Sequence, residues 1–196
     1  MEAVDRNWTL FLDRDGVINR RLPGDYVRNW EEFEFVEGVL PALRLLAALF
    51  GRIIVVSNQQ GIGKGLMEET ELALIHERMR GEVQAAGGRI DAIYFCPGLA
   101  SDNPPCRKPN TGMALQARQD FPEIDFARSF MAGDTVSDME FGARLGLVNV
   151  LIGADEETLG KLSGEAHSGM VRYRFDDLYR FAQAIYNSNT SVAPQP

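Results

Sequence analysis

Short, almost continuously apolar runs alternate with amphipathic segments along this chain, and this alternation limits its possible folds more than any other feature. Five such runs occupy residues 8–12, 52–56, 92–95, 129–132 and 147–152, and residues 170–175 form a weaker candidate. Runs of this kind are typical of strands covered on both faces of a parallel sheet. Between them, apolar residues recur at helical spacing in residues 37–50, 72–83, 113–121, 136–145 and 179–186. The pattern predicts an α/β fold with a doubly wound parallel sheet.

Composition indicates one folded domain. The chain has 196 residues, of which 45% are hydrophobic and 24% charged, as is usual for globular proteins. We predict a single domain over residues 1–187, without an internal repeat or linker. Residues 188–196 are polar and include two prolines, and we expect them to form a disordered tail.

Charge and hydropathy exclude several kinds of partner. No apolar stretch approaches the roughly 18 residues of a membrane span, and the net charge of −8 at pH 7 argues against nucleic acid and anionic membranes. The N-terminal residues lack the features of a secretory signal, and two cysteines are too few for a disulfide scaffold. We therefore expect a cytoplasmic protein with reduced thiols. We also expect a monomer, because no conspicuous apolar patch is evident.

Polar residues with catalytic chemistry follow three of the predicted strands. Asp13, Ser57 and Asp134 come at the ends of the first, second and fourth strands, where ligands bind in a doubly wound sheet. Asp15 follows Asp13 by two positions, so one carboxylate can act as a nucleophile and the other as proton donor and base. Taken alone, the sequence DRDG is equally typical of an acidic turn.

A metal site and a cationic pair complete this set. Asp134 facing Asp13 would form an oxygen-rich site for Mg²⁺, supported by Asp138 one helical turn later, although Asp134 could equally cap a helix. Arg107 and Lys108 precede a predicted helix. Lys108 would neutralise the nucleophile and the transferred phosphoryl group, and Arg107 would bind a more distant part of the ligand. On its own, such a pair is more typical of exposed surface.

The glycine-rich segment of residues 61–65, GIGKG, does not form a known nucleotide-binding motif. A Walker A loop would need glycine in place of Asn58 and Ser or Thr in place of Gly65. We predict a flexible loop that holds Lys64 near the ligand or in solvent. Ser57, just before it, would donate a hydrogen bond to a phosphoryl oxygen, with capping of the loop as the alternative.

Taken together, the motifs resemble those of the haloacid dehalogenase (HAD) superfamily of phosphohydrolases. The matching stretches are residues 11–19 (FLDRDGVIN), 56–62 (VSNQQGI), 106–113 (CRKPNTGM) and 133–138 (GDTVSD). The similarity is greatest to the subgroup of heptose bisphosphate and histidinol-phosphate phosphatases, which residues 26–27 and 32–39 also fit. The resemblance covers approximately residues 8–152 and is more specific than any single motif.

The resemblance implies a mechanism and a cofactor. Asp13 would be the nucleophile and Asp15 the general acid and base, while Ser57 and Lys108 would stabilise the phosphoryl group. Mg²⁺ would bind Asp13, the backbone carbonyl of Asp15 and Asp134, with Asp138 in support. The leading function is hydrolysis of heptose 1,7-bisphosphate at its 7-position through an aspartyl-phosphate. Histidinol phosphate or another small sugar phosphate is the alternative substrate, and a non-catalytic sugar-phosphate binder is the alternative of another class.

Substrate specificity is expected to come from short loops, because residues 19–30 and the loop before Ser101 are too short to form a cap domain. Polar side chains of these loops and of the strand ends are the candidates for contact with a small phosphorylated sugar: Arg20, Arg21, Asn58, Gln59, Gln60, Lys64 and Arg107.

The cysteines depart from the pattern of the subgroup, whose members often bind zinc through a Cys-x-His and a Cys-x-Cys pair. Here only Cys96 and Cys106 are present, and Gly98 and Pro104 stand in the other two positions. Two ligands are too few for a structural zinc site, so we expect no zinc and two unpaired thiols. The histidines, His76 and His167, lack metal-ligand spacing and receive no catalytic role.

Overall fold

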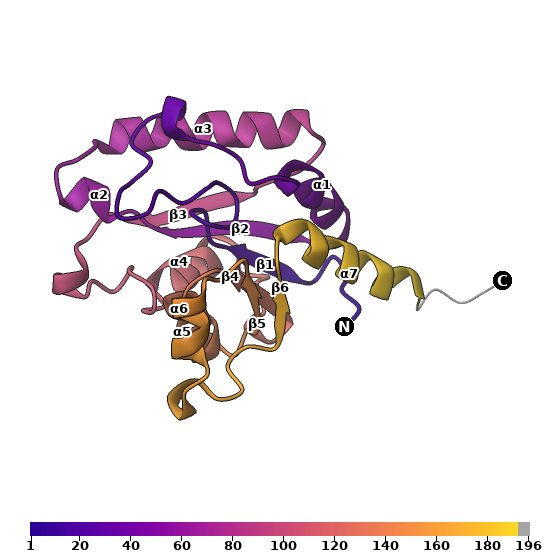
Figure 1. Cartoon of the computed structure of the whole chain (residues 1–196). Helices are drawn as coiled ribbons and strands as arrows, with labels where there is room; N and C mark the ends of the chain where they lie inside the picture. Colours follow the sequence, from indigo (N-terminus) through magenta and orange to yellow (C-terminus); the bar gives the residue numbers. More distant parts are fainter. Residues whose placement is uncertain (192–196) are drawn as a thin grey trace.

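A six-stranded, fully parallel sheet forms the centre of the computed structural model, which describes residues 1–191 (Figure 1). Its strand order is β3-β2-β1-β4-β5-β6, so the chain winds outward in both directions from β1. This order places a topological switch point between β1 and β4, where doubly wound proteins bind ligands. The strands are β1 (Thr9–Leu12), β2 (Arg52–Asn58), β3 (Ala92–Cys96), β4 (Ser129–Gly133), β5 (Val148–Ile152) and β6 (Tyr173–Phe175). The predicted fold class is confirmed.

Helices cover both faces of the sheet. One face carries α1 (Val39–Leu49), α3 (Glu69–Ala85) and α7 (Leu178–Ser191), and the other carries α4 (Gly112–Asp120) and α5 (Val136–Leu145), with α6 (Glu156–Leu162) beside α5 (Figure 1). The short helix α2 (Gln60–Gly63) follows β2 directly. Single turns of 3₁₀-helix occur at Trp30–Glu32, Ala100–Asp102, Phe126–Arg128 and Glu165–His167.

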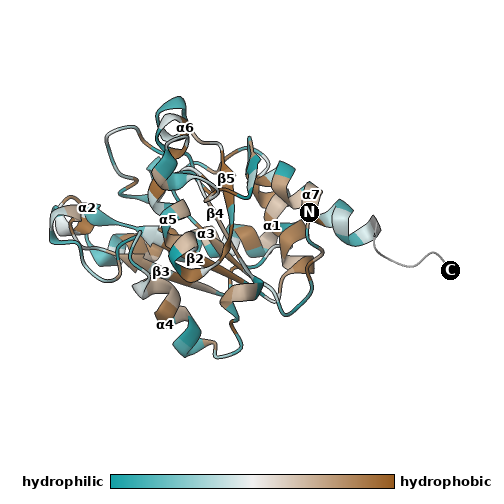
Figure 2. Cartoon of the chain, turned by 90° about the horizontal axis from the view of Figure 1, so that it is seen from below, coloured by the Kyte–Doolittle hydropathy of each residue, from teal (hydrophilic) through white to brown (hydrophobic). Residues whose placement is uncertain are grey.

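Alternate strand residues pack into two separate apolar layers. Leu10 and Leu12 of β1 join the core beneath α1, α3 and α7, whereas Phe11 points to the core beneath α4 and α5. Because side chains alternate across a strand and both faces are covered, the central strands need apolar residues at every position. Figure 2 shows this distribution, with hydrophobic strands in the middle and hydrophilic residues mainly on the outside.

The segment between β1 and α1, residues 13–38, passes over the carboxyl edge of the sheet without forming a further domain. Its ends are held together by backbone hydrogen bonds from Arg20 to Glu34 and from Val36 to Ile18. The segment contains a single 3₁₀ turn, as expected for a chain without a cap domain. In residues 1–191, no helix is long and apolar enough to cross a membrane.

Two local predictions from the sequence are wrong. The expected flexible loop at residues 61–65 begins as helix α2, with Lys64 at its C-cap. The expected disorder of residues 188–191 is replaced by the last turn of α7, where Asn189 exchanges hydrogen bonds with the backbone of Val4 at 2.9 and 2.6 Å. Residues 192–196 lie outside the described part of the chain.

Candidate active site

The carboxyl ends of β1 and β2 form the floor of a cavity of about 490 Å³, and residues 21–27 form part of its wall. Parallel register brings the strand ends together: Leu12 is paired with both Val55 and Ala132. Most of the candidate residues predicted from the sequence line this cavity: Asp13, Asp15, Arg21, Ser57, Asn58, Gln59, Gln60, Lys64, Arg107 and Lys108.

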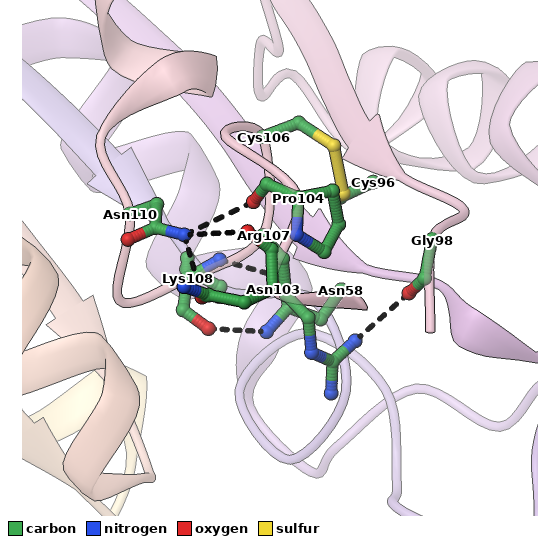
Figure 3. Close-up of a disulfide and its surroundings, with 9 residues drawn as sticks. All are labelled: Asn58, Cys96, Gly98, Asn103, Pro104, Cys106, Arg107, Lys108 and Asn110. Atoms are coloured by element: carbon green, nitrogen blue, oxygen red, sulfur yellow. Dashed lines mark hydrogen bonds between the residues drawn. A yellow bond between two sulfur atoms is a disulfide. The ribbon is translucent and has the colours of Figure 1, made fainter. Parts of the chain in front are cut away.

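A buried lysine joins two carboxylates at the floor. The Nζ atom of Lys108 is 2.7 Å from Oδ1 of Asp13 and 2.6 Å from Oδ1 of Asp138. Although burial lowers it, the charges of Asp13 and Asp138 raise the pKa of Lys108 to about 12. Asn58 fixes the lysine backbone, accepting from its N–H at 2.9 Å and donating to its carbonyl at 3.1 Å (Figure 3). Lys108 is therefore a fixed, permanent positive charge beside Asp13.

Three carboxylates converge next to this lysine. Asp13, Asp134 and Asp138 each offer an oxygen, and these atoms lie within 4.8 Å of one another. Gly16, at a φ of 98°, allows this approach, because an added Cβ would lie 2.0 Å from Oδ2 of Asp134. Burial, with the neighbouring acidic charges, raises the pKa of Asp13 to about 6 and that of Asp134 to about 8. A buried cluster of hard oxygen donors, whose ionisation together is opposed by their own like charge, fits Mg²⁺.

Arg21 lies across two of the groups expected to bind the metal. Its Nη2 donates to Oδ1 of Asp134 at 2.8 Å and to the backbone carbonyl of Asp15 at 3.1 Å. Burial alone would lower the pKa of Arg21, but the charge of Asp134 raises it. Arg21 thus binds the acidic cluster rather than projecting freely into the cavity.

Asp15 accepts hydrogen bonds from three side chains. Arg14 donates to both of its oxygens at 2.9 and 3.1 Å, Asn19 donates at 2.9 Å and Gln59 at 2.7 Å. Burial raises the pKa of this carboxyl, but the charge and hydrogen bonds of Arg14 outweigh it, so the pKa lies below its ordinary value. Gln59 also donates to Oγ of Ser57 at 2.7 Å. The acidic and hydroxyl groups are thereby linked into one network.

Polar groups from separate segments line the outer part of the cavity. The hydroxyl of Tyr26 accepts from Gln60 at 2.8 Å and from Lys64 at 2.9 Å. Arg107 donates to the carbonyl of Gly98 at 3.5 Å (Figure 3), and its partial burial lowers its pKa. Arg20, by contrast, pairs with Glu34 at 3.3 Å and is 61% exposed outside the cavity lining. The structure does not bring Arg20 into the cavity with the other candidates, and its role in substrate binding stays a prediction.

Comparison with known proteins identifies the family. A family described as HAD-hydrolase-like matches residues 105–178. The chain is 38% identical to D-glycero-alpha-D-manno-heptose-1,7-bisphosphate 7-phosphatase of Mycobacterium bovis, over 94% of each chain. It is 34% identical to D-glycero-beta-D-manno-heptose-1,7-bisphosphate 7-phosphatase of Yersinia pestis, over 90% of this chain and 96% of that one. The chain belongs to the HAD-like phosphatase family.

A solved structure supports the same assignment. The crystal structure of D,D-heptose 1,7-bisphosphate phosphatase from B. bronchiseptica, complexed with magnesium and phosphate, has a TM-score of 0.83 and 28% identity to this chain. The similarity covers 92% of this chain and 99% of that one. The resemblance predicted from the sequence is confirmed, and Mg²⁺ fits both this phosphatase family and the acidic cluster.

The cysteines of this HAD-like phosphatase are joined to each other (Figure 3). Cys96 ends β3 and Cys106 directly precedes Arg107, and their sulfur atoms form a disulfide with a Cα–Cα distance of 5.3 Å. The prediction of two unpaired thiols is wrong. The loop of residues 97–105 returns to the edge of the sheet, which brings together cysteines that are 10 positions apart. The disulfide ties the segment that carries Arg107 and Lys108 to the end of β3.

Sequence reasoning missed two side chains of the phosphatase site. Arg14 is wholly buried beneath Asp15, and Tyr26 organises Gln60 and Lys64. Arg14 carries a recognisable signal, because a charged residue stands between two carboxylates directly after an apolar strand. Tyr26 is an aromatic residue in a polar loop, and nothing local to it indicates which residues it contacts.

Proposed function

We propose that this phosphatase hydrolyses the 7-phosphate of D-glycero-D-manno-heptose 1,7-bisphosphate through an aspartyl-phosphate intermediate. The observation that carries the proposal is the Asp13 carboxylate, held 2.7 Å from the buried Lys108 ammonium on the floor of a cavity that Asp15 and Ser57 also line. Sequence identity of 34–38% to heptose-1,7-bisphosphate 7-phosphatases supports the choice of substrate.

In the first step, an oxygen of Asp13 attacks phosphorus and the bond from phosphorus to the sugar oxygen breaks. Asp15 gives a proton to that oxygen, so the sugar leaves as an alcohol. Lys108 offsets negative charge on the nucleophile and on the phosphoryl oxygens, and the hydroxyl of Ser57 donates to one of those oxygens.

In the second step, Asp15 is a carboxylate and takes a proton from water, whose oxygen attacks phosphorus. The bond between phosphorus and Asp13 breaks, which releases inorganic phosphate and restores the nucleophile. The donors around Asp15 favour its ionised form, which this second step requires. The first step requires the protonated form, which the negative charge of a bound phosphate group beside Asp15 would favour.

Asp13, Asp134 and the backbone carbonyl of Asp15 would hold Mg²⁺, with Asp138 beside them. When bound, the ion supplies positive charge that the buried carboxylates and the phosphoryl group lack. Because Arg21 contacts two of these groups, we infer that it changes partners when the metal binds and turns towards the substrate.

Phosphate release from a panel of substrates tests the proposal. The panel contains the α and β anomers of heptose 1,7-bisphosphate, heptose 7-phosphate, histidinol phosphate and p-nitrophenyl phosphate, each with Mg²⁺ and with a chelator. We expect a heptose bisphosphate to give the highest kcat/KM and the chelator to abolish turnover. Faster turnover of histidinol phosphate would select the alternative substrate.

The Asp13→Asn variant is the control for chemistry. It removes the nucleophile without changing side-chain size, so turnover should be lost while the fold is kept. Undiminished turnover would exclude the proposed nucleophile. Sugar-phosphate binding by a wild-type protein that turns over none of the panel would favour the non-catalytic binder. A cytoplasmic location, a monomeric state and a site without zinc stay predictions from the sequence.

A further inference from the structure

A buried histidine that takes no part in the proposed reaction stands behind the acid–base residue. His76 lies on α3, is only 8% exposed, and places its Nε2 3.3 Å from Nη1 of Arg14. Nη2 of the same guanidinium donates to both oxygens of Asp15. A chain of contacts therefore runs from α3 through Arg14 to the carboxylate.

The chemistry of the two side chains determines which one donates the hydrogen bond between Arg14 and His76. A guanidinium carries only donors, so Nε2 of His76 must accept and the ring proton must be on Nδ1. Burial, and then the charge of Arg14, lowers the pKa of His76 to about 3, so the ring remains neutral. Phe95 of β3 packs edge-on against the ring, with 6.0 Å between centroids. His76 is thus held in place as an acceptor.

Arg14 depends on this acceptor because it is wholly buried. Within residues 1–191, its Nε already lacks a hydrogen-bond partner, while its Nη2 serves Asp15 and Gln59. Loss of the acceptor on Nη1 would leave a second buried nitrogen of the guanidinium without a hydrogen-bond partner. Rotation of the guanidinium to satisfy it would carry Nη2 away from Asp15.

We propose that His76 is a positioning residue of this phosphatase: by accepting from Arg14, it fixes the orientation of the Asp15 carboxylate towards the leaving oxygen. The inference rests on the acid–base role that the proposed function gives to Asp15. It assigns a task to a helix that otherwise only covers the sheet, and His76 acts without touching the substrate.

Leaving-group dependence separates positioning from general damage to the fold. The value of kcat/KM reports the steps up to departure of the alcohol. A sugar oxygen needs a proton in that step, whereas p-nitrophenolate leaves without one. Mispositioning of Asp15 should therefore slow the sugar phosphate selectively. A structural defect should slow both substrates alike.

The experiment compares His76→Leu with His76→Gln, whose side-chain carbonyl can accept in the position of Nε2. For His76→Leu, we expect kcat/KM to fall about tenfold or more with heptose bisphosphate and less than about twofold with p-nitrophenyl phosphate. His76→Gln should keep both values within about threefold of the wild type. Ile75→Val, a buried change on the same helix, is the matched control and should leave kcat/KM unchanged with both substrates.

Any of three results would overturn the proposal. His76→Leu could lose kcat/KM equally on both substrates, or it could keep the wild-type values. His76→Gln could also be as impaired as His76→Leu. Asp15→Asn distinguishes this failure from failure of the proposed function. If Asp15→Asn shows the selective loss and His76→Leu does not, only the positioning role is wrong. If Asp15→Asn slows both substrates equally, the acid role of Asp15 fails, and the role of His76 fails with it.

Discussion

Ser57 shows how a single hydroxyl can be prepared for one hydrogen bond. Its Oγ accepts from Gln59 at 2.7 Å, so its own hydrogen is available to a group in the cavity that Ser57 lines. If Ser57 donates to a phosphoryl oxygen in the transition state, Ser57→Ala should lower kcat/KM by about 10²–10³, or ~3–4 kcal/mol. Steady-state kinetics with the best substrate of the panel measures this effect.

Ser129 offers the matched control for that change. It is also fully buried, but it lies at the start of β4 and its hydroxyl donates to the carbonyl of Asp125 at 2.6 Å. Ser129→Ala should affect stability and leave kcat/KM unchanged. An unchanged rate for Ser57→Ala would restrict Ser57 to bracing the strand end.

Arg21 supplies a positive charge to the groups expected to hold Mg²⁺. Because metal binding must displace the guanidinium from Asp134 and from the carbonyl of Asp15, Arg21→Ala should tighten Mg²⁺ binding, by about tenfold if one charged hydrogen bond of ~1.5 kcal/mol is removed. Titration calorimetry of the metal-free protein measures the dissociation constant. Arg20→Ala is the control, because Arg20 pairs with Glu34 away from the site. Weaker or unchanged binding by Arg21→Ala would contradict this competition.

The different positions of these adjacent arginines show where prediction from the sequence stops. Both are cations after the same motif, and both were expected to bind substrate. Backbone pairing of Arg20 with Glu34 extends the chain at this point, so successive side chains point to opposite sides. Only Arg21 then reaches Asp134. The register of the backbone pairing between Arg20 and Glu34 decides which of the two arginines reaches the site. The local sequence does not reveal that register.

At the scale of elements, residues 97–105 are closed into a loop by the disulfide between Cys96 and Cys106. A disulfide between cysteines 10 positions apart lowers the conformational entropy of the unfolded chain. This effect stabilises the folded state by about 2–3 kcal/mol. The double variant Cys96→Ser/Cys106→Ser should therefore lower the free energy of unfolding by about that amount in urea denaturation. Reduction of the wild type with dithiothreitol should produce a similar loss.

The double variant also serves as the control for the reductant, which should not change its stability. Since Arg107 and Lys108 directly follow Cys106, we expect the loss to be accompanied by a higher KM. Equal stability of the oxidised and reduced wild type would show that the disulfide does not form in solution or does not constrain the chain.

The elements that the sequence predicts well are those whose periodicity extends over several residues. The central strands and the helices α1, α3, α4 and α5 follow directly from apolar spacing, and Asp13, Ser57 and Asp134 follow from the strand ends. Helices α2 and α6 have four and seven residues, which is too short for a helical period to stand out. The disulfide could not be predicted, because pairing depends on how the loop after β3 returns to the sheet.

At the scale of the whole molecule, the strand order concentrates charge that is distant in sequence. β1 and β4 are neighbours, so Asp13 and Asp134 meet at the switch point, and the helix that follows β4 adds Asp138. The capping box at Thr135 orients Asp138, which frees its other oxygen for Lys108. The same topology that creates a ligand site therefore buries carboxylates close together. Because these groups ionise, the stability of the folded protein should depend on pH and on bound metal.

The sign of this connection follows from the folded-state pKa values. Folding raises the pKa of Asp13 from 3.8 to about 6 and the pKa of Asp134 from 3.8 to about 8. Between about pH 4 and pH 8, the folded protein therefore holds protons that the unfolded chain has released. Their contribution makes the metal-free protein less stable as the pH rises through this window. Asp15 does not share in this, because its pKa is lowered in the folded state.

Mg²⁺ should reverse that trend, because it would bind the ionised carboxylates and stabilise only the folded state. We expect the increase in Tm on adding Mg²⁺ to be small at pH 5 and largest near pH 8. Thermal unfolding from pH 5 to 9, with chelator and with Mg²⁺, measures both curves. Asp134→Asn, which cannot ionise, should flatten the metal-free curve and abolish most of the Mg²⁺ effect. An increase in Tm that is the same at pH 5 and pH 8 would mean that Mg²⁺ does not bind through these carboxylates, because a site made of them must lose protons to accept the ion.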